Sequence, residues 1–245
     1  MASVRDPRIA ARVGPVRFQD AAPDARAIVY AGIQADPLVG RAATLLADAT
    51  HEQRVLARAV MNGMSTDPAV WRAMFPTLFG VAAASGPERD RSDAILAVSV
   101  GVAERGEQVR SQFRGAIVES LTEILVRRRA MSPEPVVRRE RRILFDGVRA
   151  EIHPYDVTVE TPGAPEAIDC KWGARGINAD VLHQLDDATT HAADEDERLS
   201  ASLVVFDARR SCDVRLGRQT APHEATRLIA LETLDELGRP MTAQR

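Results

Sequence analysis

The chain contains a single lysine, Lys171, and its type suggests chemistry. Lysine and arginine together number 32 in the 245 residues, and the other 31 are arginine. Arginine stays protonated and presents a flat fork of donors, whereas lysine is a compact charge whose pKa changes readily with burial. A position that keeps lysine in so arginine-rich a chain indicates a role that arginine cannot fill.

Asp169 lies two residues before this lysine, in the strand-like segment 166–172. Side chains alternate between the two faces of a strand, so Asp169 and Lys171 are expected on one face and Ile168 and Cys170 on the other. A carboxylate and an ammonium would then lie together where the strand ends.

Asp156 brings a second carboxylate, from the strand-like segment 155–160. A turn around Pro162 and Gly163 would pair the two strands and bring Asp156 beside Asp169. Two close carboxylates repel unless a proton or a cation intervenes. Mg²⁺ suits such a pair because it takes oxygen ligands and keeps several waters. A water acidified by the ion can attack a phosphodiester, and a lysine can orient that water, help to deprotonate it and stabilise the charge on phosphorus.

The second half of the chain must supply the elements that position these residues. Apolar residues at helical or strand spacing predict helix, three strands, helix and strand, in that order, and then a last helix. The predicted ranges are 107–129, 142–148, 155–160, 166–172, Asn178 to about Ala192, 201–206 and about 222–237.

The first half reads differently, because its pattern from Pro23 to Glu104 is helical and lacks a strand signal. Thr50 and Gln53 form a capping-box pattern that predicts a helix through Met64. Residues 1–20 are expected to be loose. The sequence therefore predicts a helical N-terminal domain over 1–105 and an α/β domain over 106–245.

Asp156 followed by Asp169-Cys170-Lys171 resembles the signature of the PD-(D/E)XK nuclease superfamily. The restriction-endonuclease-like fold of that family has an αβββαβ core, which is similar to the predicted order of elements. Its first core helix often carries a glutamate in a Gly-x-x-x-Glu setting, and Glu119 stands in such a setting here. The resemblance covers roughly 107–210. It departs from the commoner pattern in having Tyr155 directly before Asp156, with Pro154 one residue further back, and in having Asp rather than Glu at 169.

The resemblance also implies roles for individual residues. Lys171 would be the catalytic lysine, and Gln184 would be the counterpart of a glutamine that several subfamilies place on the following helix. The ligands of Mg²⁺ or Mn²⁺ would be Glu119, Asp156, Asp169 and the backbone carbonyl of Cys170. The implied activity is metal-dependent hydrolysis of DNA, in restriction or anti-phage defence or in DNA repair.

Charge and composition limit the kinds of partner that the protein can have. The net charge of −3 does not favour a nucleic-acid binder, but residues 105–149 hold 11 arginines against 6 acidic residues. Such a local basic surface is enough to bind phosphates. The N-terminal helices could receive a protein partner or a second copy of the chain. Two cysteines and the lack of a long apolar run predict a cytoplasmic protein without a membrane partner.

Plainer interpretations stay open. Lys171 could be an ordinary cation at a strand end, Asp156 a charge that protects a sheet edge, and Cys170 a small core residue. Glu119 and Gln184 are each weak signals alone. The alternative function is a non-catalytic module on the same fold that binds nucleic acid or protein.

Overall fold

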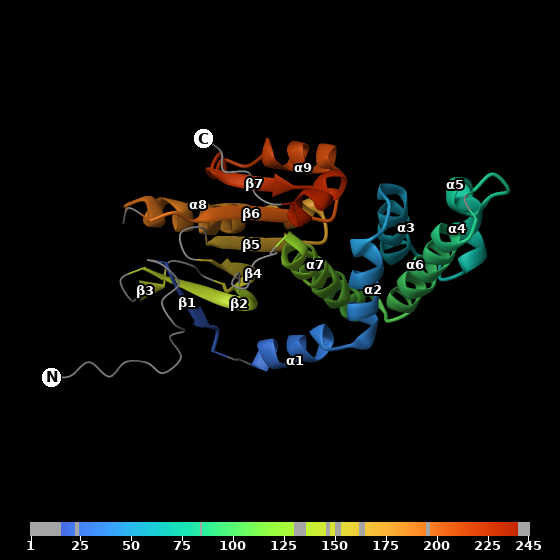
Figure 1. The fold of residues 1–245 in the computed structure, drawn as a ribbon, viewed down its shortest axis with the longest axis horizontal. Coiled ribbons are helices and arrows are strands. Elements are labelled where there is room, and N and C mark those ends of the chain that lie inside the picture. The colour runs from blue at the N-terminus through green and yellow to red at the C-terminus, as the bar shows by residue number, and fades with distance from the viewer. Residues whose placement is uncertain are drawn as a thin grey trace. The chain divides into compact units, whose positions relative to one another are not determined.

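The computed structural model describes residues 16–22, 25–83, 85–129, 136–145, 148–149, 153–161, 165–194 and 197–239. The chain divides into two compact units (Figure 1). One consists of Asp24–Ile124 and is helical, and the other consists of Met1–Pro23 together with Leu125–Arg245 and contains a β-sheet. Within the described parts of the chain, no helix is long and apolar enough to cross a membrane.

The helical unit holds six helices and most of a seventh among its described residues. They are α1 (Ala25–Gln34), α2 (Pro37–Ala47), α3 (His51–Asn62), α4 (Pro68–Met74), α5 (Pro76–Phe79), α6 (Pro87–Ala103) and α7 (Glu107–Arg129). The boundary between the units falls inside α7, nineteen residues later than the predicted limit at residue 105. The reason is that α7 continues unbroken from Glu107, so the change in sequence pattern at Gly106 does not coincide with a change of unit.

Local capping explains where α3 begins. The backbone N–H of Gln53 donates to the Thr50 hydroxyl at 3.3 Å, and the Thr50 N–H donates to Gln53 Oε1 at 2.9 Å. This reciprocal pair is the predicted capping box, and it satisfies two donors that a helix start leaves without partners. The Gln53 amide also donates to Ser92 Oγ at 2.9 Å, which joins α3 to α6.

The sheet unit contains the other elements. They are β1 (Arg17–Asp20), β2 (Val136–Phe145), β3 (Val148–Arg149), β4 (Tyr155–Glu160), β5 (Glu166–Lys171), the 3₁₀ turn η1 (Ala174–Gly176), α8 (Ala179–Asp194), β6 (Ser200–Val205), α9 (Arg209–Leu216), β7 (Thr226–Ile229) and the 3₁₀ helix η2 (Leu231–Gly238). The unit is therefore an α/β structure whose mixed sheet is accompanied by helices.

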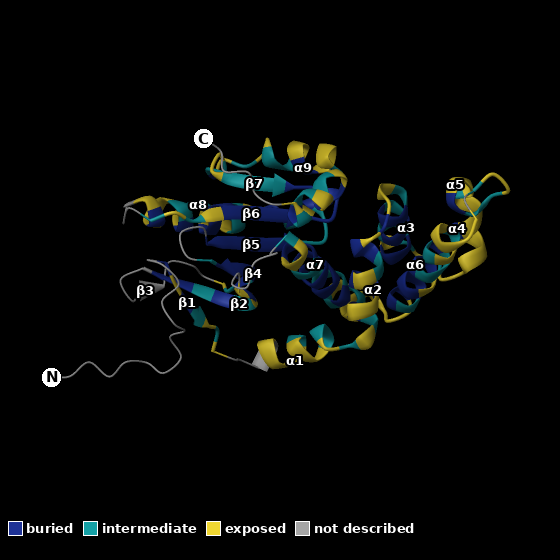
Figure 2. Cartoon of the chain, viewed as in Figure 1, coloured by how far each residue is buried: buried dark blue, intermediate teal, exposed yellow. Residues whose placement is uncertain are grey.

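The described strands form one seven-stranded sheet in the order β1-β2-β4-β5-β6-β7, with β3 also pairing with β2. Neighbours from β1 to β5 run antiparallel, while β5, β6 and β7 run parallel. Figure 2 shows β5 and β6 almost wholly buried, and the apolar run of β6 is typical of such a strand. The connection between β4 and β5, which includes the predicted turn at Pro162 and Gly163, lies outside the described residues over 162–164.

The prediction of a loose N-terminus is wrong for residues 17–20. Arg17–Asp20 form β1, whose four residues pair with Arg141–Leu144 of β2. Phe18 is buried against Ile143 in the sheet core. So short a segment has no periodicity of its own, and the ladder bonds to β2 make it a strand. β2 begins six residues before the predicted 142. Ladder bonds to its neighbours β1 and β4 extend the strand beyond the segment whose own pattern predicts it.

The predicted helix over 222–237 is also wrong. Its first part is β7, which pairs in parallel with β6, and its second part is the 3₁₀ helix η2. The helix α9 was not predicted. Leucines of both parts are buried or half-buried, so an apolar spacing that resembled one helix is divided between a strand and a short helix.

Candidate functional site

The candidate site lies where β5 ends. β5 pairs in parallel with β6 along its whole length, from Glu166 opposite Ser200 to Lys171 opposite Val205. The first five residues of β5 are buried, and Lys171 is the first to be partly exposed. Lys171 thus lies at the edge of the buried core, where its ammonium can reach solvent.

Asp156 meets β5 through the backbone. The last β4–β5 pair toward this end is Val157 opposite Ile168, and Asp156 is the next residue of β4. Beyond that pair, the N–H of Cys170 donates to Asp156 Oδ2 at 2.6 Å. The Asp156 carboxylate therefore accepts from an N–H group that lies beyond the last β4–β5 pair. Because Cys170 stands between Asp169 and Lys171, this bond keeps Asp156 near both of them.

Asp169 and Lys171 form an ion pair on β5. The ammonium Nζ donates to Asp169 Oδ1. The side chain of Asp169 is 9% exposed and that of Lys171 is 26% exposed, so the pair is sheltered. Burial lowers the pKa of Lys171, but the charges of Asp169 and then Asp156 outweigh this effect and raise the pKa above its usual range. Lys171 is thus a fixed positive charge beside two carboxylates.

These three side chains include two carboxylates, which are oxygen donors of the kind that Mg²⁺ binds. Their formal charges sum to −1, which attracts a divalent cation, and Mg²⁺ is often bound through one or two carboxylates together with water and substrate phosphates. Among the residues the structure describes, no group of three or more histidine, cysteine, aspartate and glutamate side chains is arranged to hold a metal. The donor set that the structure assembles is therefore two carboxylates, not a complete protein cage.

Gln184 has a structural partner. Its side-chain amide donates to the carbonyl of His153 at 3.1 Å and accepts from the His153 N–H at 3.2 Å. The Gln184 carbonyl also accepts from the hydroxyl of Tyr155 at 3.0 Å. The glutamine of α8 thus fixes the chain that leads into β4, three residues before Asp156, and its catalytic role stays a prediction.

Glu119 belongs to the helical unit and is bonded there. Its carboxylate is buried and accepts from the Tyr30 hydroxyl at 2.5 Å and from the Gln34 amide at 2.8 Å. Both donors come from α1, so Glu119 joins α1 to α7. Neither donor was singled out in the sequence, because only folding brings residues 85 and 89 positions away to this carboxylate.

Changing Tyr30 to phenylalanine should destabilise the helical unit by about 1–3 kcal/mol, because a buried carboxylate loses one of its donors. Denaturation followed by the fluorescence of Trp71, in a Trp172→Phe background, measures this unit. Thr44→Val is the control, since it removes an exposed hydroxyl and should change stability by less than about 0.5 kcal/mol. Equal stability of Tyr30→Phe and the parent protein would contradict the structural role of Glu119.

Asp207 is a residue of this region that the sequence did not reveal. It stands two residues after the end of β6, is buried, and accepts from the N–H of Ala174 at 2.9 Å and from the N–H of Ala208 at 2.8 Å. A polar residue at the end of a continuous apolar strand was the signal that could have indicated it. Its two bonds tie the η1 turn, which comes just after Lys171, to the end of β6.

The two cysteines are not candidates for nucleophilic chemistry. Both are buried, and neither is in a disulfide bond. Burial, and then the charge of Asp207, raises the pKa of the Cys212 thiol to about 12. Cys170 contributes its backbone N–H to Asp156, and the metal ligand implied for it, its carbonyl, stays a prediction.

A thiol reagent at pH 8 should therefore leave Cys212 unlabelled in the folded protein. Only the thiolate reacts, and a pKa near 12 leaves roughly one part in ten thousand ionised at that pH. Mass spectrometry of protein treated with and without denaturant measures the outcome. Labelling should appear on both thiols in denaturant, and rapid labelling of Cys212 in the native protein would contradict the burial described here.

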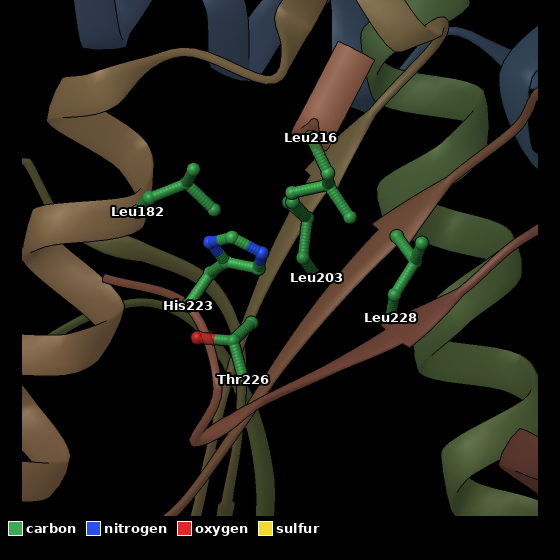
Figure 3. A pocket seen from close by; sticks show the side chains of 6 residues that line it. All are labelled: Leu182, Leu203, Leu216, His223, Thr226 and Leu228. Carbon is green, nitrogen blue, oxygen red and sulfur yellow. The ribbon is translucent and has the colours of Figure 1, made fainter. Parts of the chain in front are cut away.

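A small cavity lies between α8, α9, β6 and β7 (Figure 3). Most of its lining is leucine, with His223 and Thr226 as the polar members. It has room for about one water molecule. None of the acidic residues or the lysine described above lines it, so it is not part of the candidate site.

Comparisons with known proteins add little. No protein-family model matches the chain, and no curated protein sequence matches it. Among solved structures, the chain is similar to the protein VC1899 from Vibrio cholerae, with 15% sequence identity and a TM-score of 0.44 over 91% of this chain. The chain spans 57% of the length of that protein. A similarity of this size carries no argument about function.

Proposed function

We propose that this protein is a Mg²⁺-dependent nuclease that hydrolyses phosphodiester bonds of DNA. The observation that carries the proposal is the meeting of Asp156, Asp169 and Lys171 at the ends of β4 and β5. Two carboxylates and a fixed ammonium at one sheet end are the groups that metal-assisted phosphodiester hydrolysis needs.

The order of elements supports the same proposal. A helix, three antiparallel strands (β2, β4 and β5), a helix and a parallel strand follow one another from α7 to β6, apart from the two-residue β3. This order resembles the core of the PD-(D/E)XK nucleases, in which the motif residues stand on the second and third strands. Here Asp156 is on β4, and Asp169 and Lys171 are on β5.

In this proposal Asp156 and Asp169 hold the ion. Bound Mg²⁺ would supply a Lewis acid and would lower the pKa of a water that can attack phosphorus. Lys171 stays protonated, so its part is to attract a non-bridging phosphate oxygen and to stabilise the negative charge that grows there. Glu119 remains a ligand that the resemblance predicts, and its bonds to Tyr30 and Gln34 are those that metal binding would have to replace.

The basic residues of the sheet unit suggest how the substrate is held. Arg127, Arg128 and Arg138 are exposed and could contact phosphates. Two other arginines of the same stretch are engaged in ion pairs with little exposure, Arg129 with Glu166 at 2.5 Å and Arg141 with Glu160 at 2.6 Å. The phosphate-binding surface is therefore smaller than the count of arginines in the sequence suggests.

The test is cleavage of supercoiled plasmid DNA and of labelled single-stranded and duplex oligonucleotides with Mg²⁺ or Mn²⁺. We expect cleavage that EDTA abolishes and that Asp156→Asn and Asp169→Asn each reduce by at least about a hundredfold. Asp213→Asn is the control, because this aspartate is half-exposed and pairs with Arg209 in α9. Cleavage that survives EDTA and both substitutions would contradict the proposal.

The same preparation tests the alternative, a non-catalytic module. Salt-dependent binding of DNA without cleavage, unchanged by Asp156→Ala, would assign the fold a binding role. If neither nucleic-acid binding nor cleavage is found, a protein partner of the helical unit becomes the remaining hypothesis.

A further inference from the structure

The stem of Lys171 is covered by the turn that follows it. A side chain at Gly176, the last residue of η1, would place its Cβ 2.9 Å from Cδ and 3.0 Å from both Cβ and Cγ of Lys171. Real Cβ atoms essentially never come within 3.0 Å of another atom, so the 2.9 Å contact would force something to shift. These contacts include the root of the lysine side chain, which cannot turn aside as its flexible tip could. Glycine at 176 therefore lets the turn lie directly on the lysine stem.

Asp207 holds this turn in place from the neighbouring strand. Its Oδ2 accepts from Ala174, the first residue of η1, while its Oδ1 accepts from Ala208. The backbone of Asp207 is itself fixed, because its carbonyl accepts from the N–H of Leu231 at 3.0 Å. The Asp207 carboxylate is thus fixed in position and links the turn to the segment after β6.

A second set of contacts fixes the other end of the segment. The N–H of Phe206 donates to the carbonyl of Lys171 at 2.9 Å, and the rings of Trp172 and Phe206 stack with centroids 5.0 Å apart. The chain from Lys171 to Gly176 is therefore tied to the end of β6 both at its start and at its turn. A lysine stem has four rotatable bonds, and this enclosure restricts the positions that its ammonium can take.

We propose that Gly176 and Asp207 are positioning residues that hold the Lys171 ammonium beside Asp169. Whether these two residues hold the ammonium in place can be measured in the protein without DNA. The consequence of this positioning for catalysis rests on the proposed nuclease function, since misplacing a catalytic group by about 1 Å can lower a rate by about a hundredfold.

The single lysine makes this positioning directly measurable. Protein labelled with ¹³Cε-lysine has one lysine cross-peak in a ¹H–¹³C spectrum, and that peak reports the surroundings of Lys171. We expect Gly176→Ala to move this peak, because the new methyl group displaces the stem. Gly217→Ala is the matched control. It makes the same change at the end of α9, where the nearest atom to the new Cβ is a carbonyl oxygen at 3.4 Å, and it should leave the peak in place.

Asp207 provides an independent pair of variants. Asp207→Ala removes both acceptors and should move the lysine peak, whereas Asp207→Asn keeps one acceptor and should move it less. If Gly176→Ala does not fold, the Asp207→Asn variant, which conserves shape, decides the question. A lysine peak that stays within its linewidth in every folded variant at positions 176 and 207 would overturn the inference.

The kinetic readout separates this inference from the proposed function. If the protein cleaves DNA, kcat should fall about tenfold to a hundredfold in Gly176→Ala with KM nearly unchanged, while Gly217→Ala keeps the parent values. If the wild-type protein does not cleave DNA, the nuclease proposal fails and the spectra still decide whether these residues position Lys171. Shifted spectra with an unchanged kcat would overturn the catalytic consequence alone.

Discussion

Replacing Lys171 by alanine should lower the rate of DNA cleavage by about 10²–10³-fold while leaving DNA affinity within a few-fold of the parent value. This loss is what removing one preorganised charge from the transition state typically produces. The charge is preorganised here because Asp169 and Asp156 keep the ammonium protonated and in place. Single-turnover cleavage and a binding titration at one fixed salt concentration separate the chemical step from binding.

Lys171→Arg sharpens this prediction. It keeps the charge, but a planar guanidinium spreads that charge over a wide fork and cannot place a compact charge at the position of the lysine Nζ. We expect arginine to restore less than about a tenth of the activity. Arg209→Ala on α9 is the control for a lost surface charge. Full activity in Lys171→Ala would exclude Lys171 as the catalytic lysine even if the metal dependence holds.

Replacing Arg141 by alanine should destabilise the sheet unit by about 3–5 kcal/mol, the loss expected when one partner of a buried ion pair is removed. Arg141 is fully buried on β2. Its Nε donates to Glu160 of β4 at 2.6 Å, and its Nη1 donates to Asp20 of β1. Without the guanidinium, the cation that still faces the buried Glu160 among the described residues is Arg138, 3.9 Å away on a side chain that is 51% exposed. Denaturation followed by Trp172 fluorescence, in a Trp71→Phe background, reports this unit.

A double substitution tests the cause of that loss. Arg141→Met combined with Glu160→Leu removes both charges and should recover much of the stability, because the cost arises from the uncompensated carboxylate. Arg209→Ala breaks the exposed pair with Asp213 and should cost less than about 1 kcal/mol. A loss in Arg141→Ala no larger than that of Arg209→Ala would show that this ion pair does not hold β1, β2 and β4 together.

Local pattern was enough to predict the elements that carry the site. The helix over 107–129 and the strand over 155–160 are found with the predicted bounds, and β5 ends one residue before the predicted 172. Each of these segments is long or alternates regularly, so its own residues specify both its type and its limits. The capping box of α3 is predictable for the same reason, since its two partners lie three residues apart.

The spacing of Asp156, Asp169 and Lys171 was also readable in the sequence, because two adjacent strands bring such residues to one end. Tertiary structure decided how they are used. Asp156 accepts from the N–H of Cys170, which required β4 and β5 to separate beyond Val157 and Ile168. Periodicity contains no information about where two paired strands part.

The sequence by itself determined that one lysine and two aspartates stand at strand ends after a long helix. Only the tertiary structure decided that Arg17–Asp20 is a strand, that Gln184 holds the backbone of His153, and that Asp207 and Gly176 enclose the lysine. The physical reason is distance along the chain. Ladder bonds and buried hydrogen bonds join residues that are far apart in sequence, and each partner alone carries no sign of the other.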